Sequence, residues 1–343
     1  MSVTGALYQK YRPHSFAKVR DQDHIVAVLE GAIKKGHIPH AMLFSGTRGT
    51  GKTTLARIFA KAIGTKDLDL YEIDAASNRG IDDIRELKEA VHTLPYESDH
   101  KVYIIDEVHM LTKEAFNALL KTLEEPPSHV VFILATTEEE KLLDTILSRC
   151  QVFRMHSPSR SVLAETVTDI AEQEGFRLNP DAADLIAVAA DGSFRDALGV
   201  MQKVIMASGD TIGDADEVAA IIGAPKSSIM MQLIDALHNK KRTEALESIQ
   251  QAVESNVDIK LFVRLLLDHV RAVMLLRNLP AKKEDILSAF GTDMRDKIEG
   301  YAGGATPLNS HLLLRLLQAA DLVSRSPIPQ APIEIAIIEM TEE

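Results

Sequence analysis

The feature that most constrains this chain is a glycine-rich segment, Gly46-Thr47-Arg48-Gly49-Thr50-Gly51-Lys52-Thr53, which fits the pattern G-x-x-x-x-G-K-[ST] at every position. Apolar residues precede it and a helical pattern over Thr54–Ile63 follows, so it joins a strand to a helix. Glycines let backbone N–H groups turn toward phosphate oxygens, and the helix N-terminus adds partial positive charge. The segment predicts a nucleoside triphosphate site in a parallel α/β fold.

Individual residues of this segment have separate expected roles. Lys52 is expected to reach the β- and γ-phosphates, while Thr53 supplies a hydroxyl to Mg²⁺.

The apolar run Val102–Asp106 ends in an acid and is followed by a second acid, Glu107. We expect this strand to lie adjacent to the strand before the glycine-rich segment, with Asp106 holding Mg²⁺ through water and Glu107 polarising an attacking water. An acid directly after the metal ligand favours hydrolysis of ATP.

Further polar residues are candidates for the same site. Thr136 and Thr137 close the apolar run Val130–Ala135, and either hydroxyl could sense the γ-phosphate or place the water, although threonine is common at strand ends. Arg195 lies in the first turn of a predicted helix, where a cation opposes the helix dipole unless it faces an anion. Arg149 precedes the last predicted strand, and an ordinary surface arginine is the alternative.

The pattern along the chain indicates three parts: an α/β core over 1–157, a small helical lid over 158–224 and a helical collar domain over 225–343. In the core, short apolar runs alternate with helical patterns, which predicts a parallel sheet covered by helices. After the core, only helical periodicity remains, clearest over Ile259–Leu276 and Leu312–Val323. The expected strands are Ala41–Ser45, Leu70–Asp74, Val102–Asp106, Val130–Thr136 and Val152–Met155.

Composition excludes several classes of protein. The formal charge of −12 disfavours a nucleic-acid binder that relies on a basic surface. The single cysteine, Cys150, rules out an internal disulfide or a zinc site built from cysteines. The sequence has no apolar run long enough to span a membrane and no secretory signal, so we expect a cytoplasmic protein with no membrane partner.

Together these motifs resemble those of the AAA+ ATPases and, within them, the tau/gamma motor subunits of bacterial DNA polymerase III clamp loaders. The resemblance covers roughly the first two hundred residues, and Pro329–Met340 is a weaker match to the end of the collar. The matching stretches are Tyr8–Pro13, Phe44–Thr54, Glu72–Asn78, Asp106–Leu111, Leu119–Pro127, Ile146–Cys150 and Gly192–Leu198.

The resemblance implies further roles. Ser148-Arg149-Cys150 is similar to an arginine-finger motif that acts on ATP bound by the neighbouring subunit, Thr136 matches the first sensor and Arg195 the second. Tyr11, Arg12 and Pro13 match the segment that lies against the adenine, and Thr54 ends the phosphate-binding motif. The implied activity is that of an ATPase that opens a sliding clamp and sets it on primed DNA, within a ring-like hetero-oligomer of loader subunits held by the collar. It has no polymerase active site of its own.

One departure from the family and several alternatives remain. Family members usually have a four-cysteine zinc module, whereas here Gly64–Asp69 bridges that gap without cysteine, so the expected cofactors are ATP and Mg²⁺ but not zinc. The loop Ser77–Gly80, including Arg79, either contacts DNA phosphates without reading sequence or simply caps a helix. The alternative functions are a DNA-remodelling or branch-migration motor of the same superfamily, or a non-hydrolysing loader scaffold subunit.

Overall fold

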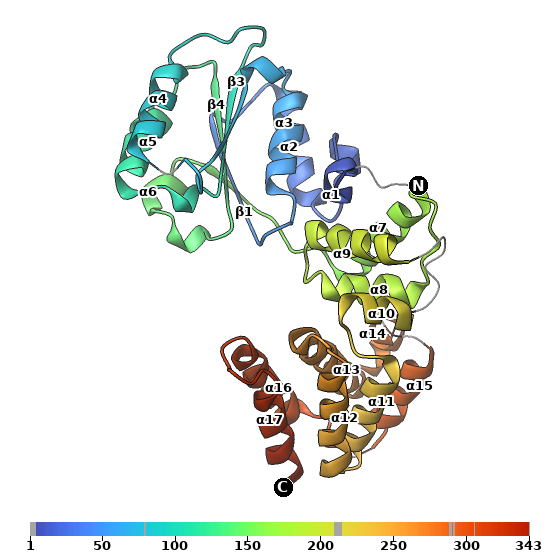
Figure 1. Ribbon diagram of the computed structural model, residues 1–343. Helices are drawn as coiled ribbons and strands as arrows, with labels where there is room; N and C mark the ends of the chain where they lie inside the picture. Colours follow the sequence, from blue (N-terminus) through green and yellow to red (C-terminus); the bar gives the residue numbers. More distant parts are fainter. Residues whose placement is uncertain are drawn as a thin grey trace. The chain divides into compact units, whose positions relative to one another are not determined.

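The computed structural model describes residues 5–78, 80–208, 215–287, 290, 292–304 and 306–342 (Figure 1). The chain divides into two compact units, and each is described by itself. The first holds Gly5–Val162 with Gly192–Arg195, and the second holds Leu163–Asp191 with the residues from Asp196 onward. Because the second unit includes parts of both the predicted lid and the predicted collar, the three-domain boundaries stay predictions.

A five-stranded parallel sheet forms the centre of the first unit, with the strand order β2-β3-β4-β1-β5. The strands are β1 (Ala41–Ser45), β2 (Leu70–Asp74), β3 (Lys101–Asp106), β4 (Val130–Thr136) and β5 (Gln151–Arg154). Each predicted strand is confirmed, with bounds that agree to within one residue. The expectation that β3 lies next to β1 is wrong, because β4 lies between them. Sequence order does not encode the order of strands in a sheet.

All seven residues of strand β4 are buried, as are all five residues of β1. An apolar strand covered on both faces is typical of the centre of a parallel sheet. In the ladder, Ser45 of β1 pairs with Thr136, and Ile105 of β3 pairs with Leu134. The loops that follow β1, β3 and β4 therefore open at the same carboxyl edge of the sheet.

Helices cover both faces of this sheet (Figure 1). Leu29 of α2 and Phe59 of α3 pack on one face, while Leu87 of α4 and Leu119 of α5 pack on the other. Thr112 begins α5 by accepting a hydrogen bond from the backbone N–H of Ala115 at 3.2 Å. The helices are α1 (Leu7–Lys10), α2 (Asp23–Lys35), α3 (Lys52–Ala62), α4 (Ile81–Val91), α5 (Lys113–Glu124) and α6 (Asp144–Leu147), with 3₁₀ turns η1 (Phe16–Lys18), η2 (Asp67–Asp69), η3 (Val108–Met110) and η4 (Glu139–Lys141).

The described residues of the second unit form helices and no strand. Side-chain caps begin several of these helices: Asn179 accepts from the N–H of Asp181, Asp258 from that of Lys260 and Asn309 from that of His311. The elements after the sheet are α7 (Arg160–Gln173), α8 (Pro180–Ala189), α9 (Phe194–Ala207), α10 (Ala215–Ile222), α11 (Ser227–His238), α12 (Arg242–Glu254), α13 (Ile259–Asn278), η5 (Pro280–Lys282), α14 (Lys283–Leu287), α15 (Thr292–Ala302), α16 (Ser310–Val323) and α17 (Ala331–Glu342).

The strongly periodic stretches of the sequence become the core helices of this second unit. Phe262 and Leu266 on α13 are fully buried and belong to the same apolar cluster as Leu312 and Leu316 on α16. The predictions of helices over these two stretches are thus confirmed. None of the described helices combines the length and apolar character needed to cross a membrane.

A buried carboxylate fixes the loop that leads into β3. Asp69 is 0% exposed, and its carboxylate accepts hydrogen bonds from the backbone N–H groups of Tyr96 (2.6 Å), Glu97 (2.9 Å) and Ser98 (2.9 Å). Burial would raise the pKa of Asp69, but these hydrogen bonds outweigh it and hold the pKa below its usual range. Lys101, at the start of β3, is 2% exposed and donates to the carbonyl of Ala90 and the hydroxyl of Thr93. Asp69 therefore holds the middle of this loop, and Lys101 joins its two ends.

We predict that Asp69→Asn loosens this loop. The asparagine side chain keeps one oxygen and replaces the other by an amide that cannot accept, so at least one backbone N–H loses its partner, at a cost of about 1–3 kcal/mol. Hydrogen exchange at the amides of residues 96–98 should accelerate, measured by NMR or mass spectrometry. Asp67→Asn, on an exposed side chain two residues away, is the matched control. Equal exchange rates in both variants would contradict the assignment.

Candidate nucleotide site

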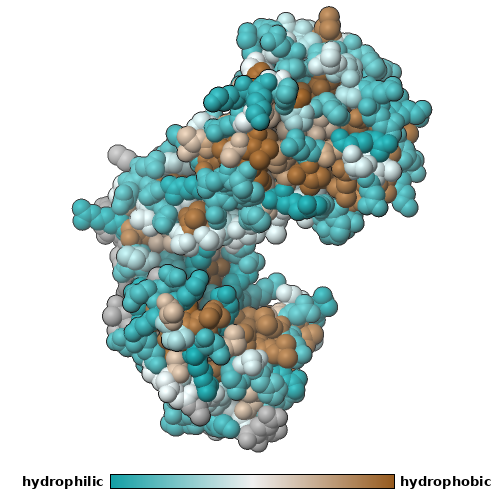
Figure 2. All heavy atoms as spheres, turned by 180° about the vertical axis from the view of Figure 1, so that it is seen from behind, coloured by the Kyte–Doolittle hydropathy of each residue, from teal (hydrophilic) through white to brown (hydrophobic). Residues whose placement is uncertain are grey.

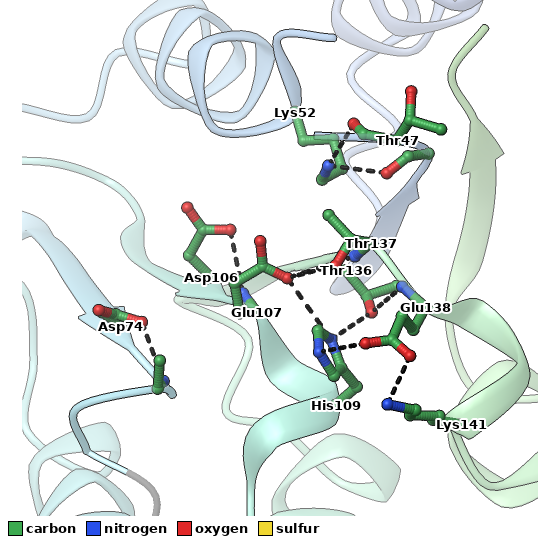
Figure 3. A network of polar contacts seen from close by, with 12 residues as sticks. Thr47, Lys52, Asp74, Asp106, Glu107, His109, Thr136, Thr137, Glu138 and Lys141 are labelled. Atoms are coloured by element: carbon green, nitrogen blue, oxygen red, sulfur yellow. Dashed lines mark hydrogen bonds and ion pairs between the residues drawn. The ribbon is translucent and has the colours of Figure 1, made fainter. Parts of the chain in front are cut away.

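The glycine-rich segment joins β1 to α3 and folds around the ammonium group of Lys52. This side chain is 6% exposed, and its Nζ donates to the carbonyl oxygens of Gly46 and Thr47, both at 2.8 Å (Figure 3). The hydroxyl of Thr50 donates to the same carbonyl of Thr47 at 3.0 Å. Burial lowers the pKa of Lys52, and the nearby acids Glu107 and Asp106 oppose that shift. The loop thus holds a buried cation next to the N-terminus of a helix.

Two glycines are needed here because of close approaches by other segments. Gly46 has φ of +148°, and a Cβ there would lie 2.6 Å from the backbone oxygen of Met155. Gly49 has φ of +77°, and a Cβ there would lie 1.9 Å from the hydroxyl of Ser193. Phe194 also donates its backbone N–H to the carbonyl of Gly49 at 3.1 Å. The glycine spacing therefore also allows residues 192–195 to contact the loop.

Hard oxygen ligands for a cation lie at the first turn of α3 and the end of β3. The Thr53 hydroxyl donates to Asp106 Oδ2 at 2.7 Å. This bond connects the helix that follows β1 with the end of β3, although β4 lies between these two strands in the sheet. One carboxylate and one hydroxyl, completed by phosphate oxygens and waters, is the kind of set that Mg²⁺ uses beside nucleotides. Among the described residues no group of three or more His, Cys, Asp or Glu side chains could hold a metal by itself. The residues fit Mg²⁺ bound together with a nucleotide.

Glu107 adopts a backbone conformation that is unusual for its residue type. Its φ of 47° and ψ of 44° place it in the left-handed region, at the turn from β3 into η3. Its Oε2 accepts hydrogen bonds from the Thr137 hydroxyl at 2.9 Å and the Thr137 backbone N–H at 3.4 Å. Such strained residues cluster at functional sites, where the surrounding structure fixes them. The carboxylate of Glu107 is thereby given a defined direction at the carboxyl edge of the sheet.

The two threonines at the end of β4 have different partners. Thr136 is 0% exposed, accepts from the N–H of Glu138 at 3.0 Å and lies 2.9 Å from Nδ1 of His109, whereas Thr137 is the residue bonded to Glu107. His109 and Glu138 did not emerge from the sequence as site residues. The signals available for His109 were its position two residues after the acid pair and its place in the matching stretch Asp106–Leu111.

The segment before α2 lies against the first turn of α3. Arg12 donates from Nε to the Thr54 hydroxyl at 3.0 Å, and its neighbours Tyr11 and Pro13 are half-buried. Burial is the main reason that the pKa of Arg12 is lowered, with Arg57 contributing. The structure therefore brings the predicted segment over Tyr11–Pro13 to the helix that follows the phosphate-binding loop.

Arg195 is the second residue of α9, as the helix pattern indicates. Its guanidinium lies 5.9 Å from the ring centroid of Tyr8. Burial is the main cause of the lowered pKa of Lys52, and the charge of Arg195 adds a smaller contribution in the same direction. An exposed cation in the first turn of a helix opposes the helix dipole. A bound anion between Arg195 and Lys52 would offset both repulsions.

Arg149 does not join this group. It precedes β5, so it lies at the amino edge of the parallel sheet, whereas Lys52 follows the carboxyl end of β1. At about 3.3 Å per residue, the four-residue strand alone separates these edges by about 13 Å. Arg149 forms an ion pair with Glu124 at the end of α5 and donates to the Thr145 carbonyl at 2.5 Å. The structure thus leaves Arg149 out of the site of its own subunit.

The loop after β2 is tied to its own strand end. Asp74 accepts from the N–H of Ala76 at 2.9 Å and the hydroxyl of Ser77 at 3.1 Å, and Asn78 donates to the Asp74 carbonyl. Arg79, proposed as a DNA contact, lies outside the described residues. The capping role expected for this loop is partly visible, because the N–H of Gly80 donates to the Asp83 carboxylate at the start of α4.

Comparison with known proteins identifies related sequences along most of the chain. Residues 64–159 match the family model for the DNA polymerase III delta subunit, 163–210 that for the ATPase lid domain of DNA polymerase III clamp loader subunits, and 214–342 that for domain III of DNA polymerase III subunits gamma and tau. The chain is 38% identical over 296 residues to DNA polymerase III subunit tau of Bacillus subtilis, which covers 80% of this chain and 52% of that protein.

Other relatives agree with this assignment. The chain is 35% identical over 356 residues to DNA polymerase III subunit tau of Escherichia coli, covering 98% of this chain and 54% of that protein. It therefore spans about half the length of the curated relatives that it matches. Among solved structures, the Thermotoga maritima RuvB Holliday junction branch migration motor has a TM-score of 0.53 at 21% identity, covering 70% of this chain and 85% of that one. This second likeness concerns the fold alone.

We predict that Lys52→Ala weakens nucleotide binding. The change removes the buried cation facing the phosphate position, and a charge-assisted hydrogen bond of about 1.5–3 kcal/mol corresponds to a roughly 10- to 100-fold loss of affinity. Titration with a fluorescent ATP analogue would measure the loss. Lys61→Ala, which removes an exposed lysine from the same helix, should bind as the unmodified chain does. Tight binding by Lys52→Ala would refute the phosphate-site assignment.

Proposed function

Since the chain belongs to the gamma/tau family of DNA polymerase III clamp-loader subunits and has an AAA+ fold, we propose that it is an ATP-hydrolysing motor subunit of a clamp loader. The observation that supports this most directly is the convergence of Lys52, Thr53–Asp106 and Glu107 at one sheet edge. In this function the motor opens a ring-shaped sliding clamp and places it on primed DNA. The work is carried out in the cytoplasm and needs no polymerase site.

The proposed binding step uses groups that are already in position. The phosphates of ATP are held by backbone N–H groups of residues 46–51 and by the N-terminus of α3. Lys52 exchanges the carbonyls of Gly46 and Thr47 for phosphate oxygens, and Tyr11–Pro13 lies against the base. Thr53 and Asp106 hold Mg²⁺, which neutralises charge on the phosphates. Thr136 and Arg195 sense the γ-phosphate from the end of β4 and the start of α9.

The proposed chemical step is attack by water on the γ-phosphorus. Glu107 accepts the proton of the water as the new oxygen–phosphorus bond forms and the bond to the bridging β-oxygen breaks. Thr137 holds Oε2 of Glu107, which orients the carboxylate toward the water. The presence of Lys52, Asp106 and Glu107 in one arrangement argues against a scaffold subunit that does not hydrolyse ATP.

Arg149 is proposed to complete the site of a neighbouring subunit. Because it lies at the opposite sheet edge from Lys52, a head-to-tail contact is needed to bring it to a γ-phosphate. Such a contact repeated around a ring of loader subunits places one arginine at each interface. The branch-migration alternative has only likeness of fold in its favour, since the RuvB structures that resemble this chain are 20–21% identical to it in sequence.

Assembly is proposed to use the last two helices. Leu314 and Leu317 on α16 and Ile335 on α17 are 54%, 51% and 55% exposed, and Figure 2 shows apolar side chains at the surface over these helices. Exposed apolar surface of this kind is typical of protein–protein contacts. The other loader subunits are the expected partners there, with the clamp and the DNA backbone contacted by the first unit.

We predict that Glu107→Gln binds ATP but hydrolyses it slowly. The carboxamide cannot accept the proton of the water, and loss of a general base typically slows a reaction by about 10²–10⁴. Single-turnover hydrolysis and nucleotide titration should be measured on the reconstituted loader. Glu114→Gln, on an exposed side chain of α5, is the matched control. A Glu107→Gln rate equal to that of the control would place the general base elsewhere.

We predict that Arg149→Ala binds ATP normally in its own subunit and silences hydrolysis in the next. An arginine finger contributes roughly 10³–10⁵ in rate. Mixed complexes of Lys52→Ala and Arg149→Ala subunits should regain activity wherever an intact Lys52 faces an intact Arg149. Arg177→Ala, on an exposed loop, is the control. If assembled mixtures stay inactive at every ratio, Arg149 does not act across subunits.

A further inference from the structure

A histidine that neither the motif nor the proposed mechanism uses lies beside the proposed base. The side chain of His109, in η3, is 5% exposed. Its Nδ1 lies 2.9 Å from the Thr136 hydroxyl and 3.5 Å from Oε2 of Glu107, and its Nε2 lies 3.3 Å from Oε1 of Glu138 (Figure 3). The ring therefore connects the turn after β3 with the end of β4. Both nitrogens face polar atoms of residues at the candidate site.

The partners of His109 fix the ring from both sides. Glu138 is a carboxylate at neutral pH, because its hydrogen bond from Lys141, at 2.5 Å, lowers its pKa although burial opposes the shift. The Glu138 carboxylate lies 3.3 Å from Nε2, within ion-pair distance. Nδ1 faces both the Thr136 hydroxyl at 2.9 Å and Oε2 of Glu107 at 3.5 Å, and a proton on Nδ1 is attracted to that carboxylate oxygen. The ring cannot turn without breaking both contacts.

This fixed ring lies against the same carboxylate oxygen that Thr137 holds. Oε2 of Glu107 accepts the Thr137 hydroxyl at 2.9 Å and has Nδ1 of His109 on another side at 3.5 Å. Glu107 itself is held in the left-handed region, which costs a non-glycine residue about 1–2 kcal/mol and persists only where neighbours fix it. The hydrogen bonds from Glu107 N–H to Asp106 Oδ1 and from Met110 N–H to the Glu107 carbonyl fix the backbone, but not the side chain.

We infer that His109 is a positioning residue for the proposed hydrolysis, which holds Oε2 of Glu107 against Thr137 and so directs Oε1 toward the attacking water. The inference rests on the proposed function, in which Glu107 is the base. His109 touches neither phosphate nor water in this role. It acts by restricting the directions that the Glu107 carboxylate can take.

Three substitutions separate this role from a purely structural one. His109→Asn keeps an amide near the place of Nδ1, His109→Gln puts its amide near the place of Nε2, and His109→Leu removes both while keeping most of the volume. The rate of single-turnover hydrolysis should fall least for the asparagine variant and by about 10- to 100-fold for the leucine variant. This loss is smaller than the whole contribution of a general base, about 10²–10⁴, because Glu107 itself is unchanged. ATP affinity should stay within about twofold, because no contact of Lys52 changes. His92→Ala, an exposed histidine at the end of α4, is the control.

A double-substitution cycle decides between the outcomes. If His109 acts through Glu107, the leucine variant should cost little further rate in a Glu107→Gln background. The inference would be overturned if the leucine variant lost as much rate in the Glu107→Gln background as it does alone. It would also be overturned if all three variants hydrolysed ATP at the rate of the control with normal ATP affinity. A Glu107→Gln protein as fast as the control would instead overturn the role of Glu107 itself, so the two failures are distinguishable. Affinity lost together with rate in all three variants would show a structural role and also overturn it.

Discussion

The hydrogen-bonded ladder of β4 between β1 and β3 is the constraint on which the rest of the site depends. Its seven residues are all buried, so its register with both neighbours is fixed by packing as well as by backbone hydrogen bonds. This strand sets the distance between Lys52, after β1, and Asp106, after β3. The hydroxyls at its end contact His109 and Glu107. A slip of one residue would turn Thr136 to the other face and disconnect His109.

Much of this arrangement could be predicted from the sequence because it is local. Strand bounds followed from apolar runs, and the loop over Gly46–Thr53 followed from a pattern in which each position has a steric or electrostatic reason. The prediction that failed was the order of the strands, which is not a local property of the sequence. The position of β4 between β1 and β3 is decided by how strands pack, and nothing in the order of the chain encodes it. Of the two threonines at the end of β4, Thr137 is the one that donates to Glu107.

The residues that sequence reasoning missed are those whose meaning depends on partners brought from elsewhere in the chain. His109 is one histidine among twelve until the fold places it between β3 and β4. Glu124 lies in the matching stretch Leu119–Pro127, but only the structure shows that it pairs with Arg149. Asp69 was noticed only as part of a connection that lacks cysteines, yet its buried carboxylate organises three backbone amides. Each of these depends on tertiary contacts.

The carbonyls of Gly46 and Thr47 accept hydrogen bonds from the buried ammonium of Lys52. A buried cation without partners would draw in water or distort the loop, so these two acceptors stabilise the loop from within. One side chain thereby ties the start of the glycine-rich segment to the first residue of α3, and the segment closes on itself through its own lysine.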